Sequence, residues 1–156
     1  MMKQEFMREA IRLSIENINH GGGPFAAVVV KGDEIVAATG NSVTLDNDPT
    51  AHAEVNAIRQ ACKKLQTFDL SGCDIYASCE PCPMCLAAIY WAHIDHLYYA
   101  ATRKDAASIG FDDNMIYEQI PMNPAERNIP GEQIMHEEAL EAFKKWNDSS
   151  DTVTHY

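Results

Sequence analysis

Phe25-Ala26-Ala27-Val28-Val29-Val30 is the stretch that decides the fold, because it is a short, unbroken apolar run rich in valine. Such a run is typical of a buried strand. Gly21-Gly22-Gly23-Pro24 precedes it and ends a helix that helical spacing predicts over residues 6–18. Residues 31–34 predict a turn, and residues 35–39 the returning strand of a hairpin. The chain is therefore expected to begin with a helix and an antiparallel hairpin.

Strands and helices alternate in the remainder of the chain. The predicted elements are a helix starting at Asp48-Pro49-Thr50, a strand over 74–78, a helix from Pro81 or Pro83 to Ala92, a strand over 97–100, a short helix over 104–109 and an amphipathic helix over 132–146. Alternation of this kind indicates parallel pairing through right-handed crossovers. We expect an α/β fold, a three-layer α/β/α sandwich with a central mixed sheet of about five strands.

Composition limits the class of protein. The 156 residues suit a single domain over 1–156, in which the polar residues 147–156 form a C-terminal tail. The formal net charge of −11, from 12 basic and 23 acidic residues, opposes a polyanionic partner, so no nucleic acid is expected. No apolar run approaches the roughly 20 residues of a membrane span, and the start lacks a secretory signal. We expect a cytoplasmic protein without a membrane partner, whose five cysteines bind metal or stay free.

Two motifs carry the chemistry, namely His52-Ala53-Glu54 and Pro81-Cys82-Pro83-Met84-Cys85. Cys82 and Cys85 lie on neighbouring parts of one helix face, in a first turn where the helix dipole favours thiolates. His52 and Glu54, two residues apart, share one site only if that site lies beyond the N-terminal end of their helix. The spacing predicts two helix N-termini that face one zinc ion, with a fourth coordination position open for water.

Three less specific readings compete with this one. A lone histidine early in a helix is usually structural, and a lone C-x-x-C pair can be a redox pair. The strongest alternative is a closed structural zinc site in which Cys79 completes a set of three cysteines and one histidine. Cys79 falls at the end of a predicted strand, however, and a closed site would leave Glu54 without a task. We therefore favour an open, catalytic site.

The two motifs match the signature of the zinc-dependent nucleobase and nucleoside deaminases, a family with the cytidine-deaminase-like fold, and the chain resembles this family. The resemblance implies that His52, Cys82 and Cys85 hold one zinc ion per subunit. It also implies that zinc activates water for attack on an amine-bearing ring carbon. Glu54 would take the proton of the water, pass it to the ring and help to expel ammonia.

Within that family the chain looks most like the small bacterial guanine deaminases, over nearly its full length and least over residues 120–155. The segments that carry this likeness are Gly23-Pro24-Phe25, Asn41-Ser42-Val43, Asn47-Asp48-Pro49-Thr50-Ala51-His52-Ala53-Glu54, Ser78-Cys79-Glu80-Pro81, Ala88-Ile89-Tyr90-Trp91-Ala92, Gly110-Phe111-Asp112-Asp113 and Tyr156. The implied reaction is the hydrolysis of guanine to xanthine and ammonia, and the implied partner is a small purine.

The same likeness assigns the substrate contacts. Asn41 should bond to the purine edge, since an amide offers both a donor and an acceptor. Phe25 and Trp91 should wall the pocket, Ala53 should touch the base, and Asp113 should contact the base or assist proton transfer. Ordinary readings remain open: Asn41 could close a turn, Phe25 and Trp91 could be core residues, and Asp113 could be a solvated surface charge.

Tyr156 is expected in the pocket of a neighbouring subunit. In the resembling enzymes the C-terminal segment crosses to the partner, which implies a homodimer with exchanged C-terminal segments. Against this stands the general disorder of final residues. Three other functions remain open, namely deamination of another free base such as cytosine, deamination of tRNA adenosine, and a non-catalytic zinc-stabilised binding module. The acidic charge disfavours the tRNA substrate, and an inert Glu54→Ala change would favour the binding module.

Overall fold

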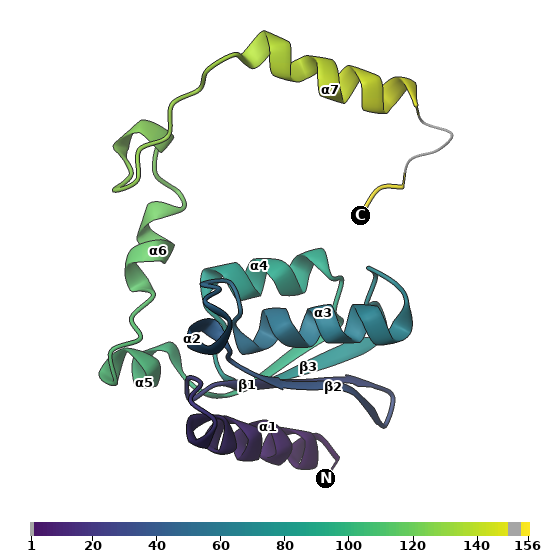
Figure 1. Ribbon diagram of the computed structural model, residues 1–156, viewed down its shortest axis with the longest axis vertical. Helices are drawn as coiled ribbons and strands as arrows, with labels where there is room; N and C mark the ends of the chain where they lie inside the picture. Colours follow the sequence, from purple (N-terminus) through teal and green to yellow (C-terminus); the bar gives the residue numbers. More distant parts are fainter. Residues whose placement is uncertain (1, 150–153) are drawn as a thin grey trace. The chain divides into compact units, whose positions relative to one another are not determined.

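The valine-rich run forms the inner strand β1 (Ala26–Lys31) of a four-stranded sheet whose order is β2-β1-β3-β4. β1 pairs antiparallel with β2 (Glu34–Gly40) and with β3 (Cys73–Cys79), while β3 pairs parallel with β4 (His96–Ala101). The structure is a computed structural model that describes residues 2–149 and 154–156 (Figure 1). The predicted hairpin, the later parallel pair and the mixed sheet are confirmed.

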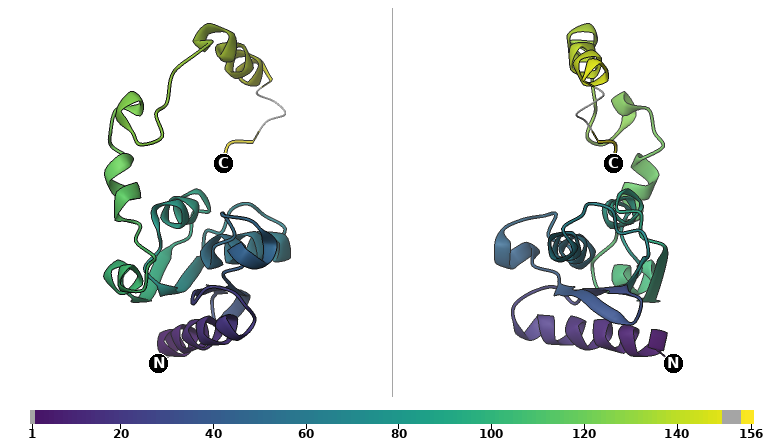
Figure 2. Two further views of the ribbon diagram at one scale, coloured as in Figure 1. Left: turned by 60° about the vertical axis from the view of Figure 1, so that its left-hand side comes forward. Right: turned by 90° about the vertical axis from the view of Figure 1, so that its right-hand side faces the viewer.

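Helices cover both faces of this sheet (Figure 2). Helix α1 (Met2–Asn19) lies on one face, and helices α3 (Ala53–Leu65) and α4 (Pro83–Trp91) lie on the other. The side chains of Ala27 and Val29 join the core cluster that includes residues of α3, whereas Val28 and Val30 join the cluster that includes residues of α1. Residues 26–30 of β1 are all apolar because both faces of this part of the strand are buried. The three-layer α/β/α sandwich is thus confirmed.

Helix α3 packs on the sheet through small side chains. Ala57 and Ala61 are fully buried, while the predicted stripe residues Ile58, Cys62 and Leu65 are partly buried around them. Alanine has the highest helix propensity and adds little bulk, so the helix approaches the strands closely. The first turn of α3 is held against the sheet by the Thr39 hydroxyl, which donates a hydrogen bond to the Ala53 carbonyl at 2.9 Å.

The helix starts differ from the sequence prediction by a few residues. α3 begins at Ala53 rather than near Pro49, because the Asp48 carboxylate accepts a hydrogen bond from the Thr50 amide at 2.8 Å and holds a turn there. A short helix α2 (Val43–Asp46), which the sequence analysis did not predict, precedes this turn. Helix α5 (Arg103–Ser108) starts after a capping box formed by Thr102 and Asp105.

The expectation of about five strands was one too many. After α5 the described residues contain α6 (Asn114–Gln119), the 3₁₀ helix η1 (Pro124–Glu126) and α7 (His136–Asp148), but no further strand. Prolines at 121, 124 and 130 interrupt this region, and proline cannot donate to a sheet ladder. The predicted amphipathic helix over 132–146 is confirmed as α7, although it begins four residues later, at His136, and continues two residues into the predicted tail.

The chain divides into two compact units, residues 1–113 and residues 114–156. The first unit holds the sheet, the helices that cover it and both core clusters. The second unit has no buried residue between positions 114 and 149. Residues 150–153 of the predicted tail lie outside the described residues, and the single domain over 1–156 stays a prediction.

Two expectations from the composition concern the cysteines and a membrane span. All five cysteines are free thiols, so no disulfide contributes to the stability of the fold. Among the described residues, no helix combines the length and the apolar character that crossing a bilayer requires.

Replacing Ile75 by Ala tests the core beneath α3. Ile75 on β3 is fully buried, so the change removes apolar contacts and leaves a cavity. We expect a loss of about 2–5 kcal/mol in the free energy of unfolding, measured by urea denaturation. Ile18→Ala is the matched control, because Ile18 is 54% exposed. Equal losses in both variants would contradict this placement of the core.

Candidate metal centre and active site

The two sequence motifs lie at the beginnings of two helices that share one face of the sheet. His52 is the N-cap of α3 and Cys82 is the N-cap of α4, each with an extended backbone. Neither side chain caps its own helix by a hydrogen bond. Pro83 follows Cys82 at a position where a missing amide hydrogen costs little. Two helix N-termini therefore present a histidine and a cysteine side chain that remain available to a ligand.

The donor atoms of the motifs meet at one point. The Nδ1 atom of His52 lies 3.5 Å from the sulfur of Cys82 and 3.4 Å from the sulfur of Cys85. Ligand atoms of these three residues all lie within 4.8 Å of one another. Tetrahedral zinc with ordinary Zn–S and Zn–N bonds separates a sulfur from a nitrogen ligand by roughly 3.6 Å. Both the donor types and their spacing therefore fit zinc.

The two thiols of this group differ in acidity. The interaction between the neighbouring side chains of Cys82 and Cys85 lowers the pKa of Cys82 and raises the pKa of Cys85. The hydrogen bond from His52 to Cys82 raises the pKa of the imidazole. The lowered pKa of Cys82 favours its thiolate form, which is the form in which a cysteine binds a metal ion.

Glu54 lies in the first turn of α3 and is 8% exposed. Burial raises the pKa of this carboxyl group, although a hydrogen bond from its own backbone amide opposes the shift. Interaction with the side chain of Cys85 also opposes this rise in the pKa of Glu54. A buried carboxyl group with a raised pKa thus lies next to the cluster of donor atoms, where it could accept and return a proton.

Cys79 does not belong to this cluster. Its thiol contacts the Thr102 carbonyl oxygen at 3.6 Å, and burial raises its pKa to about 11. The group that could hold a metal consists of His52, Cys82 and Cys85. The geometry therefore favours the open three-ligand site over the closed alternative that needed Cys79.

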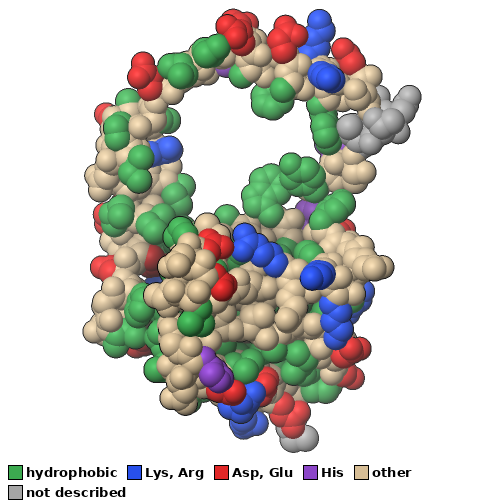
Figure 3. All heavy atoms as spheres, in the orientation of Figure 1, with side chains coloured by type: hydrophobic (Ala, Val, Ile, Leu, Met, Phe, Trp, Pro, Cys, Tyr) green, Lys and Arg blue, Asp and Glu red, His purple; other side chains and the backbone are tan. Residues whose placement is uncertain are grey.

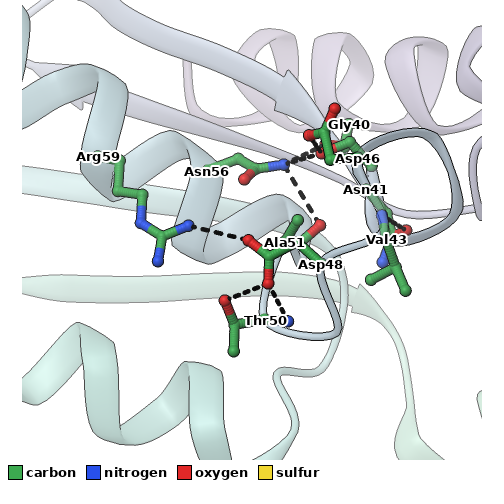
Figure 4. Close-up of polar contacts among 10 residues, drawn as sticks. Gly40, Asn41, Val43, Asp46, Asp48, Thr50, Ala51, Asn56 and Arg59 are labelled. Carbon is green, nitrogen blue, oxygen red and sulfur yellow. Dashed lines mark hydrogen bonds and ion pairs between the residues drawn. The ribbon is translucent and has the colours of Figure 1, made fainter.

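Three predicted substrate contacts lie on neighbouring segments. The Asn41 amide donates a hydrogen bond to the Phe25 carbonyl at 2.9 Å, which extends the pairing of β1 with β2. The side-chain oxygen of Asn41 accepts a hydrogen bond from the Val43 amide at 3.2 Å (Figure 4). Ala53 is fully buried at the start of α3. Asn41 closes a turn, which was the alternative to a role in substrate binding. This turn engages only the side-chain oxygen of Asn41 and leaves its NH₂ group for other contacts.

The ring of Phe25 is only partly core. It packs against the core cluster under α3 and meets the ring of Phe111 edge-on, with centroids 5.0 Å apart. Phe111 itself is 51% exposed. Two aromatic rings therefore stand together beside the segment that carries Asn41.

Asp113 is held by a residue that the sequence analysis missed. The Arg103 side chain donates a hydrogen bond to the Asp113 carboxylate at 3.3 Å, and the Arg103 amide donates to the Glu80 carboxylate at 3.2 Å. Glu80 directly precedes Pro81 and Cys82. The signal that could have located Arg103 is the Thr102-x-x-Asp105 capping box, which places it in the first turn of a helix.

The structure does not bring Trp91 to the donor cluster. Trp91 is the last residue of α4, and at a rise of 1.5 Å per residue it lies about 12 Å along the helix from its first turn. Its side chain is 65% exposed. Tyr156 belongs to the second unit and is 73% exposed. Their roles as substrate contacts stay predictions.

Residues 1–101 match the family described as the cytidine and deoxycytidylate deaminase zinc-binding region. This match contains the His52, Cys82 and Cys85 cluster and covers more than half of the chain. The chain belongs to this deaminase family. Zinc is the cofactor of the family, and the cluster is the group that could hold it.

Relatives within the family extend the match over the rest of the chain. The chain is 50% identical to guanine deaminase of Bacillus subtilis over 149 residues, which is 95% of this chain and 96% of the relative. The crystal structure of that enzyme superimposes with a TM-score of 0.95 at 48% identity, covering 98% of each chain. A tRNA-specific adenosine deaminase of Aquifex aeolicus is 39% identical over 104 residues, covering 67% of this chain and 69% of the relative.

Metal analysis of cysteine variants tests the cluster. We expect one zinc ion per chain in the wild-type protein and in Cys79→Ser, because the Cys79 thiol bonds to the Thr102 carbonyl instead. Cys82→Ser removes a soft ligand and should lower the zinc affinity by at least about tenfold, measured by competition with a chromogenic chelator. Zinc loss in Cys79→Ser with retention in Cys82→Ser would contradict the assignment.

Proposed function

We propose that this chain is a guanine deaminase, which hydrolyses guanine to xanthine and ammonia. The observation that carries the proposal is the 50% identity to the Bacillus subtilis guanine deaminase over 95% of the chain. In this reaction water attacks the amine-bearing ring carbon, a carbon–oxygen bond forms, and the carbon–nitrogen bond to the amino group breaks. Zinc, when bound by His52, Cys82 and Cys85, supplies the Lewis acidity that activates the water.

Glu54 carries the protons in the proposed reaction. Its carboxylate takes a proton from the attacking water and passes it to a ring nitrogen of guanine, and a second transfer lets the amino group leave as ammonia. Burial beside the donor cluster supports this role, because bulk water is kept away from the carboxylate. Asp113, fixed by Arg103, either contacts the purine or assists these transfers.

Asn41 and Phe25 bind the base in this proposal. The Asn41 carboxamide has its oxygen engaged by Val43, so its NH₂ group is the part that can donate to an acceptor on the purine edge. Phe25 offers an apolar ring to the base. Ala53 lies at the N-terminal end of α3, next to His52, and its small side chain leaves room for the base. Trp91 is proposed as a further wall of the pocket.

Deamination of tRNA adenosine is the second candidate, since the Aquifex aeolicus relative is 39% identical over 67% of the chain. A nucleic-acid substrate needs a basic surface to neutralise phosphates. The net charge of −11 works against such a surface. Guanine therefore remains the preferred substrate, and tRNA is included among the substrates to be assayed.

We also propose that the chain forms a homodimer in which residues 114–156 pack on the partner subunit. These residues contain no buried position between 114 and 149, so they lack a core of their own. Leu140, Phe143 and Trp146 follow helical spacing on α7 and are 39%, 70% and 41% exposed. Figure 3 shows hydrophobic side chains on one side of α7 and charged ones on the other. Such an amphipathic helix is stable only when its apolar side is covered.

Under this proposal Tyr156 reaches the active site of the partner subunit, where its ring closes the purine pocket. A cytoplasmic location is also proposed. Five free cysteines support it, because thiols persist in the reducing cytoplasm.

Ammonia release tests the reaction and its substrate. Guanine, adenine, cytosine and a tRNA anticodon stem-loop are compared for the wild-type chain and for Glu54→Gln, which keeps the shape of the side chain but removes its basicity. We expect activity with guanine, and a loss of about 10²–10⁴-fold in kcat in the variant with zinc retained. Turnover of cytosine or of the stem-loop without turnover of guanine would replace the proposed substrate.

Mixing two inactive proteins tests the exchanged segment. One protein is Glu54→Gln, and the other lacks Tyr156. In a mixed dimer one active site combines Glu54 of one chain with Tyr156 of the other, so unfolding and refolding an equal mixture should restore about a quarter of the wild-type activity. A mixture that stays as inactive as its components would refute the exchange, and light scattering checks that dimers form.

A further inference from the structure

Two asparagines that the proposed mechanism does not use hold the segment that carries Asn41. Asn56 lies on α3, one helical turn after His52, and its amide donates a hydrogen bond to the His52 carbonyl at 2.9 Å. Its side-chain NH₂ group lies 3.0 Å from the Gly40 carbonyl, 2.9 Å from the Ser42 hydroxyl and 3.3 Å from the Ala51 carbonyl (Figure 4). Asn56 thus ties the residues on either side of Asn41 to the residue that precedes His52.

Asn17 holds the same segment from the other face of the sheet. It lies at the end of α1, and its NH₂ group donates to the Gly23 carbonyl at 2.7 Å and to the Asn41 carbonyl at 2.8 Å. Its backbone carbonyl accepts a hydrogen bond from the Gly22 amide at 3.0 Å. Asn17 therefore joins the glycine-rich loop before Phe25 to the backbone of Asn41.

Two glycines make room for the Asn17 carboxamide. A Cβ atom at Gly40 would lie 2.1 Å from the side-chain oxygen of Asn17, and one at Gly22 would lie 2.4 Å from its side-chain nitrogen. Neither glycine has a positive φ, so the backbone does not require glycine at these positions. Their lack of a side chain serves the packing of the carboxamide. Asn17 and the two glycines therefore form one fitted contact.

We propose that Asn17 and Asn56 are positioning residues for purine binding, because their carboxamides clamp residues 40–42 between α1 and α3 and so fix the direction of the Asn41 side chain. The inference rests on the proposed role of Asn41 as a contact to the purine. Asparagine is unfavourable inside a helix, because its side chain competes for hydrogen bonds with the backbone groups of the helix. Here that cost is offset, since each side-chain NH₂ group donates hydrogen bonds to two or more carbonyl or hydroxyl acceptors.

The hydrogen bonds of Asn56 connect the segment of the proposed purine contact, Asn41, to the turn of α3 that carries His52 and Glu54. Asn56 follows the His52 and Glu54 turn of α3, and the Ala51 carbonyl that it contacts also accepts a hydrogen bond from the Ser42 amide at 2.9 Å. A shift of the Asn41 segment relative to α3 would therefore break contacts on both sides of Asn41. The distance between the purine contact and the donor cluster is set by these hydrogen bonds.

A double-mutant cycle tests the proposal. Asn17→Asp and Asn56→Asp each replace an NH₂ donor by an acceptor of the same shape. We expect each change to raise the KM for guanine, with a loss of about ten- to a hundred-fold in kcat/KM, a smaller change in kcat and unchanged zinc content. In an Asn41→Ala background the same changes should cost less than about twofold, because they act through Asn41.

Matched variants separate positioning from a general effect on stability. Asn19→Asp introduces the same charge two residues from Asn17, at an exposed position, and should leave KM unchanged. Gly40→Ala, which displaces the Asn17 carboxamide, should reproduce the effect of Asn17→Asp and add little to it. If Asn17→Asp does not fold, Gly40→Ala tests the same contact from the opposite side.

Amide hydrogen exchange gives a readout that does not depend on turnover. Residues 40–43 should exchange at least about tenfold faster in Asn17→Asp and Asn56→Asp than in Asn19→Asp. Full multiplicative losses in the Asn41→Ala background, or unchanged exchange in this segment, would overturn the inference while leaving the proposed function intact. A wild-type chain that does not deaminate guanine would overturn both.

Discussion

The convergence of two helix N-termini on one point is the constraint on which the rest of the structure depends. His52 and Cys82 are the N-caps of α3 and α4, and both leave their own helix uncapped by a side chain. Unpaired amides and helix dipoles make such ends favourable for anionic groups, so thiolates, a carboxylate and activated water all gain from this location. The close packing of α3 through Ala57 and Ala61 holds its end where the cluster needs it. The main role of the sheet is thus to place the N-termini of α3 and α4 at the donor cluster.

The periodic parts of the fold could be predicted from the sequence, for physical reasons. The run at 25–30 is apolar at every position because both of its faces are covered. The prolines beside Cys82 and Cys85 indicate the start of a helix, where a missing amide hydrogen costs little. The fifth strand was a wrong expectation, since no pattern supported it and prolines follow α5. α2 and the turn at Asp48 were missed because a side chain, rather than periodicity, stabilises them.

The residues of the candidate site likewise form two groups, those that sequence patterns indicate and those that only the fold reveals. His52, Glu54, Cys82 and Cys85 are close in sequence to helix starts, so their spacing alone indicates their meeting point. Arg103 and the two clamping asparagines depend on contacts between residues far apart in the sequence, such as Arg103 with Asp113, 10 residues away, and Asn17 with Asn41, 24 residues away. No local pattern encodes such contacts. The members of the candidate metal cluster could therefore be predicted from the sequence, whereas Arg103 and the two asparagines were found only from the fold.

The absence of a buried position between residues 114 and 149 has a consequence for how the protein is made. A segment without a core of its own needs a further surface to complete its folding. If it docks on a second copy, the monomer is an intermediate with exposed apolar helices, and the last step of maturation is bimolecular. Thermal stability would then rise with protein concentration, and dilution would inactivate the enzyme before it unfolds the sheet. Expression level would thereby set the fraction of chains that become active.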